Sequence, residues 1–265
     1  TVETGYYEMG DKLELVRKDD AETAGLIRSK FAIPQQVVSI ENSSVLIVDD
    51  LGRRWRLPLG DKAYTSLTNE GQLRICREVA TERDLFSCMG TFYELPAENA
   101  DGYAKIRPVS THNYRINDYA SYRGMLVLTG VNPEEGKDNE HVIVSNDSKA
   151  AVWVGVIDDL WQLGKPLGKG GPWKDTSVKA GIPSDPYLIG FYDRKKLTLS
   201  HQSADDITFT IEADPTGNGD WMEYMVRKVK AGEKWTYEFP AEFQARWIRF
   251  STDEDTKATA WLEYK

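Results

Sequence analysis

The sequence predicts an all-β protein, and three features of the chain lead to that prediction. Aromatic residues make up 11% of the 265 residues, and aromatic side chains are enriched in strands. The 21 glycines and 11 prolines recur at short intervals, which is typical of many short strands joined by turns. Segments in which apolar and polar residues alternate are frequent, whereas segments with a helical period are nearly absent.

Period-two alternation is clearest in residues 207–212, where Ile, Phe and Ile share one face and Thr, Thr and Glu the other. This pattern predicts a strand with one buried face. Similar short runs predict further strands at residues 44–48, 125–128, 141–144, 151–156, 196–200, 235–239, 246–250 and 258–264. The best helical segment is 20–30, which a loop fits equally well because it has few large apolar side chains.

Two segments contain residue types that predict turns. Residues 49–52 (DDLG) separate one predicted strand from the next, and the glycine accepts a positive φ at no steric cost, so we expect a hairpin here. Residues 214–220 (DPTGNGD) are rich in the residue types that favour turns, and we expect them to reverse the chain in the same way.

A short motif recurs four times: an aromatic residue, any residue, Leu or Phe, then Pro or Gly. It occurs at residues 55–58, 93–96, 161–164 and 237–240. Repeated supersecondary units are typical of propellers. We therefore expect a β-propeller or partial propeller of four-stranded antiparallel sheets, with a two-sheet β-sandwich as the alternative. The expected organisation is a single all-β domain over 1–265, or the C-terminal part of a longer propeller.

The composition excludes several classes of protein. The net charge is −9, and basic residues form only short runs, such as the pair Arg53-Arg54 and Arg194-Lys195-Lys196, which argues against a nucleic-acid partner. No apolar run approaches the length of a membrane span. The first ten residues lack the basic and apolar regions of an export signal, so we expect the chain to begin at a mature or trimmed end.

The two cysteines, Cys76 and Cys88, are too few for a disulfide framework. We expect two buried free thiols, because free cysteine packs as a small apolar residue. A bridge between adjacent strands in an oxidising compartment remains the alternative.

Five stretches of the sequence resemble a group of secreted bacterial proteins of polysaccharide-degrading systems. They are TERDLFSCMGTFYELP (81–96), RPVSTHNYRINDYASYRG (107–124), GVIDDLWQLGKPLGKGGPWKDT (155–176), AGIPSDPYLIGFYDRKKLTLSH (180–201) and ARWIRFSTDEDTKATAWLEY (245–264). The resemblance implies a β-propeller-like protein, exported to the periplasm or cell surface, that works on complex glycans. The group has no settled catalytic motif, so no catalytic residue is carried over.

The densest polar segment is 111–123, just before a predicted strand. Loops that lead into strands are common places for binding groups. His112 would act as a general acid or base, and Asn113, Tyr114, Arg115 and Arg123 would bind substrate through hydrogen bonds, uronate contacts or stacking. The structural alternative is that His112 and Arg123 only hold the loop through backbone hydrogen bonds.

A second polar segment runs over 157–175. Glycoside hydrolysis needs two carboxyl groups across the scissile bond, and the candidates are Asp158 or Asp159 with Asp175 as partner. Flat apolar rings bind sugars, so Trp161 and Trp173, with Lys174 beside them, are the candidate substrate contacts. The alternatives are that an aspartate caps a turn and that the tryptophans pack in the core.

Cofactor sites are weakly indicated. Asp214 and Asn218 fit part of a calcium-loop pattern, but the bidentate glutamate is missing, which favours a plain turn. The glycine-rich loop 164–171 is not followed by Gly-Lys-Ser/Thr, so it is not a phosphate cradle. No metal site is predicted from the spacing of the three histidines.

Together these features predict an exported carbohydrate-active protein, either a glycoside hydrolase or related polysaccharide-cleaving enzyme, or a glycan-binding or structural propeller without turnover. The expected partner is an oligo- or polysaccharide. A third reading is an accessory half whose pocket is completed by a missing N-terminal segment or a second chain. We expect the polar residues of 111–123 to line one concave surface together with 158–175.

Overall fold

A computed structural model describes residues 4–30, 38–61, 74–78, 83–97, 100–112, 114, 116, 118–134, 136 and 138–265. The protein is all-β, with several four-stranded antiparallel sheets, as the sequence predicts. The chain forms two compact units. Unit 1 comprises Thr1–Pro34, Asp61–Leu95 and Val109–Gly164, and unit 2 comprises Gln35–Gly60, Pro96–Pro108 and Lys165–Lys265. The expectation of a single domain stays a prediction.

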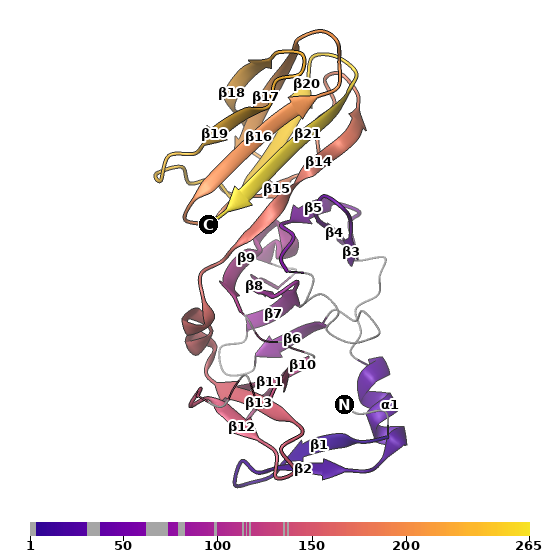
Figure 1. Cartoon of the computed structure of the whole chain (residues 1–265), viewed down its shortest axis with the longest axis vertical. Helices are drawn as coiled ribbons and strands as arrows, with labels where there is room; N and C mark the ends of the chain where they lie inside the picture. The colour runs from indigo at the N-terminus through magenta and orange to yellow at the C-terminus, as the bar shows by residue number, and fades with distance from the viewer. Residues whose placement is uncertain are drawn as a thin grey trace. The chain divides into compact units, whose positions relative to one another are not determined.

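Unit 1 is built on two four-stranded sheets (Figure 1). The first has the strand order β6-β7-β8-β9, with bounds Arg74–Glu78, Arg83–Cys88, Thr91–Leu95 and Arg107–Thr111. The second has the order β10-β11-β13-β12, with bounds Asp118–Tyr122, Met125–Val131, Ala151–Gly155 and Val142–Val144 for those four strands. A hairpin of β1 (Tyr6–Met9) and β2 (Leu15–Lys18), helix α1 (Ala21–Lys30) and the 3₁₀ helix η4 (Ile157–Leu163) complete it.

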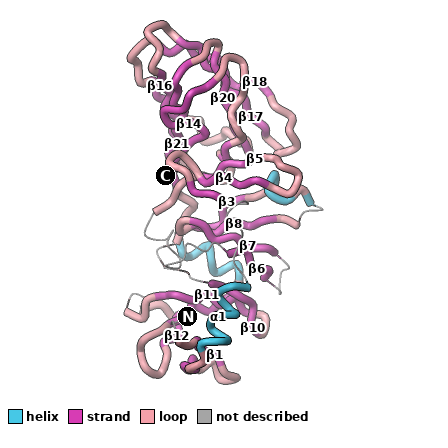
Figure 2. Tube along the Cα trace, turned by 90° about the vertical axis from the view of Figure 1, so that its right-hand side faces the viewer, coloured by secondary structure: helices cyan, strands magenta, loops and turns pink. Residues whose placement is uncertain are grey.

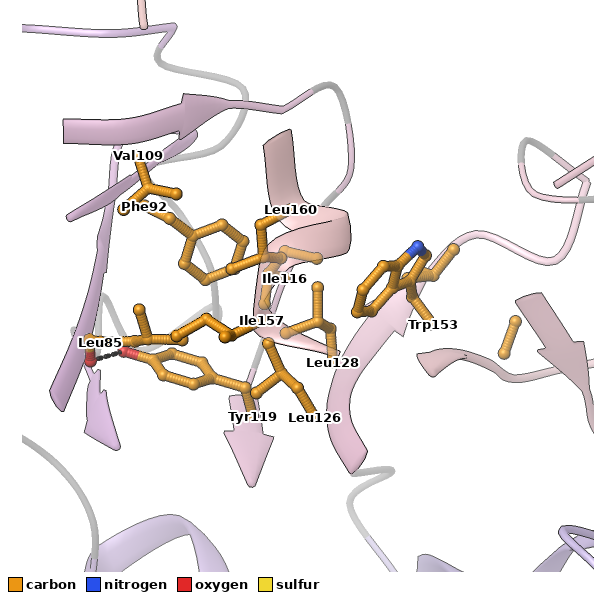
Figure 3. Packing of buried hydrophobic residues seen from close by; sticks show 12 residues of the cluster. Leu85, Phe92, Val109, Ile116, Tyr119, Leu126, Leu128, Trp153, Ile157 and Leu160 are labelled. Carbon is orange, nitrogen blue, oxygen red and sulfur yellow. Dashed lines mark hydrogen bonds between the residues drawn. The ribbon is translucent and has the colours of Figure 1, made fainter. Parts of the chain in front are cut away.

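The main core of unit 1 is a cluster of buried apolar side chains drawn from β7, β8, β9, β10, β11, β13 and η4 (Figure 3). Tyr119 fixes one side of it, because its hydroxyl donates to the carbonyl of Leu85 and accepts the backbone N–H of Ser87. A smaller cluster, which includes Leu15 of β2 and Val127 of β11, packs on the other face of the second sheet. Apolar side chains are therefore buried on both faces of that sheet.

Unit 2 is a two-sheet sandwich (Figure 1). The smaller sheet has the order β14-β21-β16-β19, with bounds Gly168–Val178, Thr256–Tyr264, Lys195–His201 and Trp235–Glu238. The larger sheet has the order β18-β17-β20-β15-β5-β4-β3, with bounds Met222–Val229, Ile207–Asp214, Trp247–Thr252, Tyr187–Leu188, Arg54–Leu57, Val45–Val48 and Val38–Ile40.

The interior of the sandwich follows from the alternation in its strands. Along β16 and β17, every second residue is buried. Rings from the two sheets meet there, with Trp173 of β14 at 6.3 Å from Phe250 of β20 between ring centroids. His201 of β16 also reaches the larger sheet, where its Nε2 lies 3.0 Å from the carbonyl oxygen of Val229. One apolar layer therefore joins the two sheets.

Residues 38–57 complete the larger sheet of unit 2, although they precede most of that unit in sequence. Strand β5 pairs in parallel with β15, with Arg56 opposite Tyr187. The junction is held by the buried guanidinium of Arg56, which donates to Asp185 and Glu41 at 2.7 Å each and to Ser44 at 2.8 Å. Figure 2 shows β3, β4 and β5 as successive strands. A buried cation that is paired in this way is costly to disturb.

Aromatic side chains lie between the edge strands β18 and β19. The hydroxyl groups of Tyr224 and Tyr237 are 2.8 Å apart, and Phe239 and Phe243 pack on the ring of Tyr224. Burial raises the pKa of Tyr224. These contacts close one edge of the sandwich with apolar surface.

Most of the predicted elements are confirmed. Each predicted strand coincides with an observed strand to within two residues at either end, except that the strand predicted at 125–128 continues three residues further, to Val131. Residues 21–30 are helical rather than a loop, because the Asp20 carboxylate accepts the N–H groups of Glu22 and Thr23 at the helix start. The turn at 49–53 is a hairpin, with Gly52 at φ +75°. Residues 215–221 connect β17 and β18, as expected.

The four recurrences of the aromatic motif are not structural repeats, and this part of the sequence interpretation was wrong. They lie on strand β5, on and just after β8, on the 3₁₀ helix η4, and on and just after β19. Both expected architectures occur instead. Unit 1 carries four-stranded antiparallel sheets of the kind expected for a propeller, and unit 2 is the sandwich.

Of the two predicted buried thiols, Cys88 is buried and free, and the side chain of Cys76 lies outside the described part of the chain. Burial raises the pKa of the Cys88 thiol to about 12. In the part of the chain that the structure describes, no helix is both long and apolar enough to span a bilayer.

Candidate functional site

His112, the predicted acid or base, is fully buried directly after β9. Its backbone N–H donates to the carbonyl of Gly90 at 2.8 Å, and its ring lies 4.8 Å from that of Phe92 between centroids. Burial lowers the pKa of the imidazole to about 4. In this arrangement His112 is a neutral core residue with no exposure to solvent, and its catalytic role stays a prediction.

The other predicted residues of this segment have separate environments. The Tyr114 hydroxyl accepts a hydrogen bond from the Asn139 amide at 2.9 Å, and its ring packs against the main core of unit 1. Arg123 occupies the turn between β10 and β11 at φ +51° and forms an ion pair with Asp11. Asn113 and Arg115 lie outside the described residues.

The remaining predicted site residues of unit 1, Asp158, Asp159 and Trp161, lie on the 3₁₀ helix η4. A 3₁₀ helix has three residues per turn, so side chains at i and i+3 lie on the same face. Ile157 and Leu160 face the core of unit 1 (Figure 3). Asp158 and Trp161, one position further along, share the opposite, exposed face, and Trp161 is 53% exposed.

The two aspartates of η4 differ in their surroundings. The Asp159 carboxylate accepts the backbone N–H of Val156 at 2.8 Å, which satisfies one of the free donors at the helix start. Asp159 is therefore the capping residue that the sequence left as an alternative. Asp158 is exposed and makes no hydrogen bond or ion pair within the described residues, so its carboxylate is available to solvent and to ligands.

Segments 111–123 and 157–163 meet through the apolar side chains of Ile116, Tyr119, Ile157 and Leu160 in the core of unit 1 (Figure 3). A concave surface shared by their polar residues stays a prediction. The expectation overlooked that an apolar residue at every third position of η4 needs a core to pack against. Residues 165–175 belong to the other compact unit.

The predicted residues of β14 divide between the core and the surface of unit 2. Trp173 is only 6% exposed and packs in the sandwich interior. Lys174 and Asp175 are exposed. The Lys174 ammonium lies 5.0 Å from the ring centroid of Trp261, and the Asp175 carboxylate accepts a hydrogen bond from the Gln202 amide at 3.1 Å.

Trp261 was not among the residues that the sequence interpretation selected. In β21 the residues Ala258, Ala260, Leu262 and Tyr264 are buried, so Trp261 points to the outer face of the smaller sheet of unit 2, where it is partly exposed. The alternation in residues 258–264 predicted a strand with one buried face. The same alternation also places Trp261 on the other, outward face, so the sequence held the signal that could have identified it.

The turn around Asp214 is organised by hydrogen bonds. The carboxylate accepts the backbone N–H groups of Gly217 and Gly219 at 2.8 and 2.7 Å. The Lys105 ammonium binds the carbonyl of Thr216 at 2.7 Å and the side chain of Asn218. A lysine cation thus contacts the Asn218 side-chain oxygen considered for calcium, and backbone N–H groups occupy the Asp214 carboxylate. Among the described residues, no group of three or more His, Cys, Asp or Glu side chains is placed to hold a metal.

No family model matches the chain, and no curated protein matches it. Among solved structures, it is similar to a crystal structure of PirA over 37% of this chain and 84% of that chain, with 12% identity and a TM-score of 0.21. It is also similar to a structure titled "CBM4 structure and function" over 65% of this chain and 83% of that chain, with 14% identity and a TM-score of 0.19.

A GH32 beta-fructofuranosidase from Bombyx mori, in complex with sucrose, covers 86% of this chain and 62% of its own, with 9% identity and a TM-score of 0.21. With TM-scores this low, none of these similarities indicates a function for this chain.

Proposed function

We propose that the protein is carbohydrate-active and binds a polysaccharide through the exposed face of η4. The observation that carries the proposal is the pairing of a largely exposed Trp161 with an exposed Asp158 on one face of a short helix. An indole ring offers a flat apolar surface to the C–H face of a sugar. A free carboxylate beside it accepts hydrogen bonds from sugar hydroxyl groups.

The helix presents these groups on a rigid support. Its opposite face is fixed by Ile157 and Leu160 in the core of unit 1, and its start is capped by Asp159. A rigid platform loses little conformational entropy when a ligand binds. The sequence resemblance to secreted proteins of polysaccharide-degrading systems gives independent support for the ligand class, and with it we propose a periplasmic or extracellular location.

Glycan cleavage is the second candidate, and Asp158 is the observation that favours it. Hydrolysis requires a second carboxyl group at about 5 to 9.5 Å across the scissile bond. Asp159 is bound to a backbone N–H, so the partner would have to come from another part of the protein or from a second chain. Binding therefore needs fewer additional groups than cleavage.

Affinity electrophoresis of the full 265-residue chain through gels that contain different polysaccharides tests the proposal. We expect at least one polysaccharide to retard the chain, and Trp161→Ala to weaken that retardation about three- to tenfold, the range for an aromatic stacking contact. Leu51→Ala, also at an exposed apolar position, is the matched control. Unchanged retardation of Trp161→Ala would contradict the proposal.

An assay for reducing ends or unsaturated products on the retained polysaccharide separates binding from cleavage. Product that appears with the native chain and is lost in Asp158→Asn would support the hydrolase. Retardation without product would support a binding protein.

A further inference from the structure

The outer face of the smaller sheet of unit 2 combines one aromatic ring with polar side chains. Thr198 of β16 lies directly opposite Trp261 of β21, and Thr236 of β19 lies opposite Thr198. Thr198 and Trp261 alternate with buried neighbours, so they point outward, and Thr236 shares their face because it lies directly opposite Thr198. The row across the strands is therefore one indole ring followed by hydroxyl groups that donate and accept hydrogen bonds.

A β-bulge brings Lys174 to this ring. Trp173 pairs with Ala260 and Thr176 pairs with Ala258, so Lys174 and Asp175 lie together opposite one residue, Thr259. Asp175 has φ +50°, and its backbone N–H donates to the Thr259 hydroxyl at 2.9 Å. A positive φ at a non-glycine residue is uncommon. The local backbone thus has a defined shape, in which the Lys174 ammonium lies 5.0 Å from the Trp261 ring centroid.

The outward face carries Glu263 and Glu238 with Lys196 directly opposite both, and Lys174 over the Trp261 ring. Within the described residues Lys174 has no carboxylate partner, whereas Lys165 and Lys179, elsewhere in unit 2, are paired with Asp193 and Asp255. The carboxylate nearest in sequence, Asp175, is bound to Gln202. Lys174 is thus an exposed ammonium over the face of the Trp261 ring, with a cation–π contact to the indole and no carboxylate partner among the described residues.

We propose that Trp261 and Lys174 form a second glycan-binding surface, specific for polysaccharide that carries uronate groups. The exposed Lys174 side chain turns off the indole to pair with the carboxylate of a uronic acid. The apolar face of the sugar ring then stacks on Trp261, and its hydroxyl groups bond to Thr198 and Thr236. The ligand class rests on the proposed function, but the residues belong to a different compact unit from Trp161, so the two surfaces are testable separately.

The test measures binding of the full chain to soluble polygalacturonate and to a neutral mixed-linkage glucan. We expect tighter binding to polygalacturonate. Trp261→Ala should weaken it about three- to tenfold through the loss of stacking, and Trp261→Tyr should restore part of the affinity. Lys174→Gln should weaken it to a similar degree and reduce its sensitivity to added salt, because an exposed ion pair is screened.

Lys230→Gln is the matched control, since it removes one exposed lysine from the turn between β18 and β19 and should leave binding unchanged. Circular dichroism of each variant verifies the fold. The proposal of a second surface is wrong if Trp261→Ala binds polygalacturonate as the native chain does. It is also wrong if Lys174→Gln and Lys230→Gln have the same affinity for polygalacturonate.

The same titrations separate this inference from the proposed function. If Trp161→Ala loses binding while Trp261→Ala binds fully, the result supports the proposed site on η4 and contradicts the second surface. The reverse result supports the second surface and contradicts the site on η4. A native chain that binds no polysaccharide overturns both.

Discussion

Trp161 and Trp173 belong to the same sequence segment and were both predicted to contact sugar, yet they have opposite environments. Trp161 is 53% exposed on η4, whereas Trp173 is 6% exposed inside the sandwich. What differs is the period of the surrounding apolar residues. Around Trp161 the apolar positions recur every three residues and exclude it, and on β14 the inward side of the strand includes Trp173. The residue type alone does not distinguish a binding platform from a core residue.

The largest expected effect is the difference in the free energy of unfolding between alanine variants of these two tryptophans. Trp173→Ala should lower the free energy of unfolding by about 3 to 5 kcal/mol, because it removes a large side chain from a packed interior. Trp161→Ala should change it by no more than about 0.5 kcal/mol, as expected for an exposed position. Urea denaturation of both variants measures the difference, and equal costs would invalidate the contrast between exposed and buried tryptophan.

A second contrast concerns His112, a buried polar residue in a segment that was predicted to be a site. Burial lowers the pKa of its imidazole from 6.5 to about 4 in the folded state. The unfolded chain therefore takes up this proton at a higher pH than the folded chain does. Between pH 6.5 and 4 the unfolded state binds more protons, so stability should fall as the pH falls, by on the order of 3 kcal/mol from this residue.

Urea titrations at a series of pH values between 7 and 4 check this effect, with His112→Phe as the comparison. The variant should have a shallower pH dependence in that window, because the titrating group is absent while an aromatic ring is kept. Parallel curves for the native chain and His112→Phe would show that His112 titrates in an exposed position, which would agree with the catalytic role predicted from the sequence.

The smallest expected effect is the difference in the free energy of unfolding between alanine variants of the two aspartates of η4. Asp159→Ala removes the acceptor of the Val156 N–H, and a lost capping contact costs about 1 kcal/mol. Asp158→Ala should change the free energy of unfolding by less than about 0.5 kcal/mol. Thermal unfolding monitored by circular dichroism resolves the two. A cost for Asp158 as large as that for Asp159 would mean that Asp158 has a structural partner.

The strands were predictable because their information is local. In residues 207–212 the alternation of Ile, Phe and Ile with polar residues is sufficient to define the buried face, and β17 has that pattern in the structure. The hairpin at 49–53 was equally local, since Asp49 accepts the N–H groups of Leu51 and Arg53 within the turn itself.

The site was less predictable because it depends on contacts between distant segments. His112 was selected for its chemistry, but its burial results from packing against Phe92, which the sequence around His112 does not contain. Trp261 was passed over for the opposite reason. Its position beside Lys174 requires the pairing of β14 with β21 and a bulge in that pairing, neither of which is encoded within one strand.

The parallel pairing of β5 with β15 bears on how the protein is made. Arg56 leaves the ribosome long before Tyr187, its partner across the sheet, has been synthesised. Until then β5 is an edge strand with unpaired backbone groups, which is a site for pairing with other chains. We therefore expect the sandwich to close only late in translation. A gene fragment that starts at residue 165 lacks β5 and leaves that side of β15 unpaired, so we expect it to yield an aggregating product.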